Sequence, residues 1–108
     1  MNILFICSRN QWRSRTAEDI YKESIHNVRS AGTAASAKIK VNAKLIDWSD
    51  MIFVMEKKHK THVQDKFSGL LDEKTIIILD IADEYQYMDP ELIEILALSV
   101  SPYIDFEI

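Results

Sequence analysis

The chain has 108 residues, which fits one domain, and its 47% hydrophobic and 28% charged residues are typical of a globular protein. A net charge of −4 argues against nucleic acid as a partner, because a phosphate backbone selects basic surfaces. No apolar run approaches the roughly 18 residues of a membrane helix, and one cysteine without an export signal predicts a cytoplasmic protein that has no membrane association and no disulfide.

Short apolar runs alternate along the chain with segments of helical periodicity. In chain order, the predicted elements are a strand at 2–6, a helix at 14–25, a strand at 28–31, a helix at 42–48, a strand at 51–55, a helix at 57–70, a strand at 75–79 and a helix from 89 to about 102. Continuously apolar strands are typical of parallel sheets that are buried on both faces. The sequence therefore predicts one α/β domain over residues 1–108, a doubly wound, four-stranded parallel sheet with helices on both faces.

Ligands of doubly wound folds bind at the carboxyl ends of the strands. Four segments are predicted to meet at that edge, residues 7–14, 30–33, 56–59 and 80–89. Beyond the last helix, Ile104, Phe106 and Ile108 alternate with other residues, a pattern that fits either a docking tail or an edge strand.

The segment from Cys7 to Ser14 carries the chemistry to which the sequence points. It lies between a predicted strand and a predicted helix, where successive backbone N–H groups form an anion-binding nest. Five residues separate Cys7 from Arg13, so the loop can wrap one phosphate while the guanidinium binds two of its oxygens. The same groups favour the thiolate, which is the nucleophilic form of cysteine. The alternative for Cys7 alone is a small buried core residue.

Residues 7–18, CSRNQWRSRTAE, resemble the phosphate-binding loop Cys-x-Gly-Asn-x-Cys-Arg-Ser-Pro-x-Ala-Glu of low-molecular-weight protein tyrosine phosphatases. Later segments are similar to further motifs of that family in the same order: SAGT at 30–33, DMIFVME at 50–56 and DEY at 83–85. The resemblance implies a phosphatase that acts through a cysteinyl-phosphate intermediate on a phosphorylated protein or a small aryl phosphate. It implies no cofactor and no metal.

The same resemblance assigns roles to individual residues. Cys7 is implied to be the nucleophile and Arg13 the phosphate clamp, while Ser14 hydrogen-bonds the thiolate and Ser30 holds Asn10. The implied phosphate-binding set consists of Ser8, Arg9, Asn10, Gln11, Trp12, Arg13 and Ser14.

Three departures from the family pattern concern the pocket. Arg9 replaces the loop glycine, whose conformational freedom is then lost. Trp12 replaces the second loop cysteine, so no internal disulfide can protect Cys7. The stretch after Thr33 is shorter than in the family and lacks its aromatic wall residue and its supporting histidine.

A general acid has to protonate the leaving oxygen, and Asp80, Asp83 and Asp89 follow the last predicted strand. Asp83 is favoured because Tyr85 follows it, as a tyrosine follows the acid in the family. Asp89 precedes a proline, as the family's acid does, but Asp-Pro is also an ordinary helix start. Tyr85 and Tyr87 can form an aromatic wall, or one of them can pack on the core.

His59 and His62 are predicted on one helix face without a third ligand, which favours a solvated face over a metal site, although His59 can also lie near the pocket. Arsenate reduction on this fold needs further cysteines, which the chain lacks. A phosphate-sensing module without catalysis remains the alternative to an enzyme.

Overall fold

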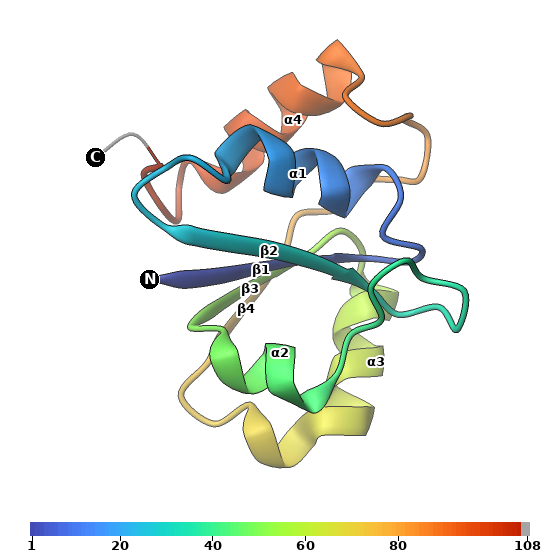
Figure 1. Ribbon diagram of the computed structural model, residues 1–108, viewed down its shortest axis with the longest axis vertical. Coiled ribbons are helices and arrows are strands. Elements are labelled where there is room, and N and C mark those ends of the chain that lie inside the picture. The colour runs from blue at the N-terminus through green and yellow to red at the C-terminus, as the bar shows by residue number, and fades with distance from the viewer. Residues whose placement is uncertain (107–108) are drawn as a thin grey trace.

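A parallel sheet of four strands, in the order β2-β1-β3-β4, forms the centre of the computed structural model, which describes residues 1–106 (Figure 1). The elements in chain order are β1 (Asn2–Cys7), α1 (Arg13–Tyr21), β2 (Asn27–Gly32), α2 (Ala43–Trp48), β3 (Met51–Val54), α3 (Lys57–Phe67), the 3-10 turn η1 (Ser68–Leu70), β4 (Thr75–Ile78) and α4 (Pro90–Val100). The predicted α/β class, strand number and parallel arrangement are confirmed.

Helices cover both faces of this sheet, with α1 and α4 on one side and α2 and α3 on the other (Figure 1). The α1–α4 side is built around Phe5, whose ring stacks on Phe53 with centroids 5.2 Å apart. On the α2–α3 side, Leu4 and Ile6 pack with Val63. Burial on both faces explains why residues 3–6 of β1 are all apolar and fully buried. Within residues 1–106, no helix combines the length and the apolar character that crossing a membrane requires.

Helix α1 is shorter than predicted, because it ends at Tyr21 rather than near Ile25. The Ser24 hydroxyl accepts a hydrogen bond from the His26 backbone at 3.2 Å, and the Ser24 N–H donates to the Tyr21 carbonyl at 3.0 Å. Serine side chains compete in this way with helical hydrogen bonds. Ile25, predicted on the inner face of the helix, is consequently exposed.

The segment after α4 was predicted to be a docking tail or an edge strand, and residues 101–106 form neither. Residues 101–106 form turns and bends rather than a strand. Phe106 is buried and stacks on Tyr21, with ring centroids 3.9 Å apart. Ile108 lies outside the described residues. Phe106 thus closes the core beneath α1 instead of presenting an apolar side chain for docking.

The four segments that were predicted to meet at the carboxyl ends of the strands do lie together there. Cys7 at the end of β1 pairs with Gly32 at the end of β2. The Met55 N–H donates to the Ile6 carbonyl at 3.0 Å, and the Ile81 N–H donates to the Met55 carbonyl at 2.8 Å. Parallel pairing therefore continues past β3 and β4 and holds the segments after them beside the loop that follows Cys7.

Gly32 is the point at which this loop approaches the sheet most closely. A Cβ atom on Gly32 would lie 2.4 Å from the Ser8 carbonyl oxygen and 2.9 Å from the Asn10 nitrogen.

We expect Gly32→Ala to lower the free energy of unfolding by about 1–3 kcal/mol, because the backbone has to move to admit the methyl group. Gly69→Ala is the matched control, since nothing lies within 4 Å of its added Cβ. Urea unfolding of both variants checks this, and equal stabilities would show that the loop does not need a glycine beneath it.

Candidate active site

The loop between β1 and α1 is shaped by one residue in the left-handed region. Asn10 has φ 56°, and it is the only residue of the loop with a positive φ. Asparagine tolerates this conformation better than most residues other than glycine. Arg9 therefore occupies the family's glycine position without needing a left-handed backbone, and the departure at that position is compatible with the loop.

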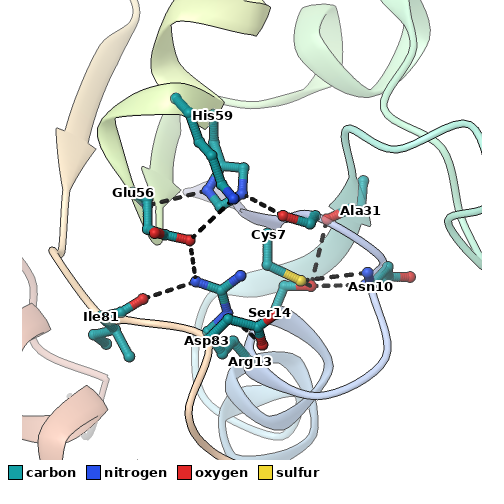
Figure 2. A network of polar contacts seen from close by, with 11 residues as sticks. Cys7, Asn10, Arg13, Ser14, Ala31, Glu56, His59, Ile81 and Asp83 are labelled. Atoms are coloured by element: carbon teal, nitrogen blue, oxygen red, sulfur yellow. Dashed lines mark hydrogen bonds and ion pairs between the residues drawn. The ribbon is translucent and has the colours of Figure 1, made fainter.

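Buried hydrogen bonds fix Asn10 and the side chains around the thiol (Figure 2). The Asn10 side-chain amide donates to the hydroxyls of Ser14 at 2.9 Å and Ser30 at 2.8 Å. The Ser30 hydroxyl in turn donates to the Glu18 carboxylate. The Asn10 backbone N–H points at the Cys7 Sγ, 3.3 Å away, and the Ser14 hydroxyl lies 3.0 Å from the same sulfur. The Asn10 N–H is thus in place as a donor to a thiolate. The Ser14 hydroxyl, which also lies 3.3 Å from the Ala31 carbonyl, is a second donor when its proton turns to the sulfur.

Arg13, the first residue of α1, is a buried cation. Its side chain is 2% exposed, and its Nη1 donates to Glu56 Oε2 at 2.7 Å and to the Ile81 carbonyl at 2.8 Å. Its Nε lies 3.6 Å from Asp83 Oδ1. The hydrogen bond from Arg13 lowers the pKa of Glu56, so that this carboxylate remains charged beside the guanidinium. One side chain thereby joins α1 to the segments that follow β3 and β4.

His59 and Glu56 belong to the site; residues 56–59 were predicted at this edge of the sheet, but neither side chain was assigned a role there. Glu56 is the N-cap of α3, and its backbone N–H donates to His59 Nδ1 at 3.0 Å. His59 Nε2 lies 2.9 Å from the Ser8 hydroxyl, so a neutral ring carries its proton on Nε2 and donates it to Ser8. The predicted solvated face is wrong for His59, which is 1% exposed, and the placement near the pocket is correct. A glutamate at a strand end with histidine three residues later was the available signal.

A pocket opens above the sulfur, and Asp83 is the carboxylate at its mouth. Its lining consists of Cys7, Ser8, Arg9, Gln11, Trp12, Arg13 and Asp83. Asp83 is 57% exposed, whereas Asp89 caps α4 by accepting the Glu91 N–H at 2.9 Å. Asp80 does not line the pocket. No group of three or more potential metal-ligating side chains occurs among the residues that the structure describes.

The two tyrosines considered for an aromatic wall have different positions. Tyr85 is half-buried and packs on the core beside α4. Tyr87 is 47% exposed, and its hydroxyl donates to Asp19 on α1. Tyr87 lines a groove next to the pocket together with Trp12, so the aromatic rings at this side of the pocket are those of Trp12 and Tyr87.

Burial makes His59 a pH-sensitive element of stability. Desolvation, and secondarily the charge of Arg13, lower the pKa of His59 from 6.5 to about 4. Between these values the unfolded chain binds a proton that the folded chain does not, so the free energy of unfolding falls as pH falls from 6.5 to 4. The loss is on the order of 3 kcal/mol. The lowered pKa of Glu56 adds a further loss only below its ordinary value of 4.5.

Urea unfolding at several pH values checks this prediction. His59→Gln keeps an acceptor for the Glu56 N–H and a donor for Ser8 but does not titrate. We expect the variant to lose much less stability than the wild type between pH 6.5 and pH 4.5. Parallel curves for the two proteins would show that His59 does not titrate in this range.

No protein-family model matches the chain, and no curated protein matches its sequence significantly. Solved structures do match it over nearly its whole length. A YwlE mutant from Bacillus subtilis is 21% identical over 96% of this chain and 99% of that one, with a TM-score of 0.68. The YwlE arginine phosphatase from Geobacillus stearothermophilus is 21% identical over 94% and 93%, with a TM-score of 0.67. The tyrosine phosphatase Wzb from Escherichia coli K30, in complex with phosphate, is 19% identical over 94% of each chain, with a TM-score of 0.74.

A low-molecular-weight protein tyrosine phosphatase from Streptococcus pyogenes matches as well, with 14% identity over 96% of this chain and 93% of that one and a TM-score of 0.66. Identities at this level establish the architecture. The chain therefore has the fold of the bacterial low-molecular-weight tyrosine phosphatases, as the resemblance of its motifs implied.

Proposed function

We propose that the protein is a cysteine-dependent phosphatase that hydrolyses phosphotyrosine in proteins and also accepts small aryl phosphates. One arrangement carries the proposal. The Cys7 sulfur has the Ser14 hydroxyl at 3.0 Å and the Asn10 N–H at 3.3 Å, within a loop closed by the buried Arg13. This arrangement presents a nucleophile, donors for its anionic form and a cation for phosphate oxygens at one point. A lone catalytic thiol also suits a reducing cytoplasm.

The first chemical step transfers the phosphoryl group to sulfur. The Cys7 thiolate attacks phosphorus, the S–P bond forms, and the bond from phosphorus to the tyrosine oxygen breaks. Asp83, as the carboxylic acid, donates its proton to the departing oxygen. Arg13 and the backbone N–H groups of the loop bind the equatorial oxygens, where negative charge is stabilised during the transfer.

The second step returns the enzyme to its starting state. Asp83, now a carboxylate, takes a proton from a water molecule that attacks the cysteinyl phosphate. The S–P bond breaks, inorganic phosphate leaves, and the thiolate of Cys7 is restored beside the Ser14 hydroxyl. The hydrolysis thus consumes one water molecule and needs no redox partner.

A phosphotyrosine substrate is favoured over phosphoarginine, the substrate class of the YwlE arginine phosphatase. Trp12 is 43% exposed at the pocket wall, where an aryl ring can pack against it. A guanidino group would instead approach Arg9 and Arg13, two cations that line the same pocket.

Cys7→Ser tests the proposal most directly. We expect the variant to lose measurable hydrolysis of p-nitrophenyl phosphate and phosphotyrosine while still binding inorganic phosphate, because the N–H groups and Arg13 remain. Steady-state kinetics and a thermal shift with phosphate measure the two properties. Near-normal turnover by the variant would refute the nucleophile assignment. A wild type that binds phosphate but hydrolyses no phosphotyrosine, aryl phosphate or phosphoarginine would identify a binding module instead.

Asp83→Asn tests the general acid, with Asp89→Asn as the matched control. A phenolate such as tyrosine's leaves poorly without a proton, so Asp83→Asn should slow phosphotyrosine turnover by about 10²–10⁴-fold. The activated p-nitrophenyl ester should lose far less. Asparagine caps a helix as well as aspartate does, so Asp89→Asn should keep both rate and stability. The reverse pattern between the two variants would transfer the acid role to Asp89.

A further inference from the structure

A second hollow adjoins the phosphate pocket and shares two of its residues. It is lined by Gln11, Trp12, Arg15, Lys38 and Tyr87, of which Gln11 and Trp12 also line the pocket above Cys7. Because Gln11 and Trp12 line both hollows, a chain that leaves the pocket past Trp12 enters this groove.

The groove is cationic on a protein that is acidic overall. The chain carries 13 Lys and Arg against 17 Asp and Glu, yet Arg15 and Lys38 both line the groove, next to Arg9 and Arg13 of the pocket. Within residues 1–106, Lys38 is exposed and takes part in none of the salt bridges. Arg15 is paired with Asp19, and Arg13 is paired with Glu56 and Asp83. Lys38 and Arg9 are therefore the cations here that have no carboxylate partner among residues 1–106. These two charges favour an anionic ligand at this place.

Asp19 is the acidic residue beneath the groove, and it holds two of the groove side chains in position. Its carboxylate accepts the Tyr87 hydroxyl and lies 3.6 Å from Arg15 Nε. Asp19 is 17% exposed, whereas the Arg15 side chain is 41% exposed. The Arg15 side chain is thus paired with Asp19 and is still partly exposed to solvent.

The walls of the groove are attached to the site by backbone hydrogen bonds. The Lys38 N–H donates to the Arg9 carbonyl at 3.1 Å, which joins the segment after β2 to the phosphate loop. The Met88 N–H donates to the Thr16 hydroxyl at 2.9 Å, which joins the segment carrying Tyr87 to α1. The backbone that carries Lys38 and Tyr87 is therefore fixed relative to the phosphate pocket, as selection of a neighbouring group requires.

We propose that this groove binds acidic residues next to the phosphotyrosine, so that the substrates are phosphoproteins with Asp or Glu flanking the phosphorylated tyrosine. This inference rests on the proposed function. The aryl ring packs on Trp12, the adjoining peptide crosses Tyr87, and its carboxylates pair with Arg15 and Lys38. A free aryl phosphate fills the pocket and leaves the groove empty.

Two phosphotyrosine peptides test the proposal, one with Glu on both sides of the phosphotyrosine and one with Gln in the same places. Their dissociation constants are measured by fluorescence polarisation on the Cys7→Ser protein, so that binding is scored without turnover. We expect the Glu peptide to bind about three- to tenfold more tightly at low ionic strength and the difference to shrink at high salt.

Lys38→Glu in the same background should abolish or reverse this preference. Lys66→Glu is the matched control, because it makes the same change in net charge at an exposed position on α3 and should leave the preference intact. Equal binding of the two peptides by the unaltered groove would overturn the inference, as would equal effects of Lys38→Glu and Lys66→Glu. Absence of hydrolysis by the wild type would refute the proposed enzyme while the binding ratio still decides the groove.

Discussion

The burial of the Arg13 guanidinium is the constraint on which the rest of the site depends. A cation that is 2% exposed needs partners, because removing an ion from water costs several kcal/mol even in a relaxed protein. Glu56 supplies a carboxylate and Ile81 a carbonyl, from the segments after β3 and β4. Arg13 can therefore be buried only when α1, β3 and β4 are all in place. The phosphate clamp is therefore complete only in the assembled fold.

The loop before Arg13 contains no glycine, and its shape depends on Asn10 within it and on Gly32 outside it. Asn10 rather than a glycine takes the left-handed position, and its amide is held by Ser14 and Ser30. The glycine that the loop requires lies outside it, at Gly32, where the backbone passes too close to the sheet for any Cβ. Arg9 and Trp12 are then free to depart from the family pattern, because their side chains line the pocket and do not support the loop.

The short segment after β2 changes how the mouth of the pocket is built. It carries no aromatic residue, but it brings Lys38 beside the phosphate loop. The exposed rings come instead from Trp12 in the loop and from Tyr87 before α4. His59 supports the opposite side by fixing the Ser8 hydroxyl. The pocket of this chain thus has aromatic side chains at its edge, although the segment after β2 supplies none.

The sequence alone determined the order of the elements and the Cys7–Ser14 loop, because apolar runs, helical periodicity and a contiguous motif are local features. The extent of α1 was predicted incorrectly because hydrogen bonds of Ser24 compete locally with the helix. The position of Phe106 and the burial of His59 were predicted incorrectly or left open, because each depends on segments distant in the chain. Tertiary structure placed Asp83 beside Arg13. The cap at Asp89 is instead a local contact with the Glu91 N–H, one of the two interpretations that the Asp-Pro pair allowed. Tertiary structure also joined Ser8 to His59 across 51 residues and Arg13 to Glu56 across 43. Such contacts follow from the strand order, which local patterns do not encode, and burial then decides whether a polar side chain becomes a partner or remains solvated.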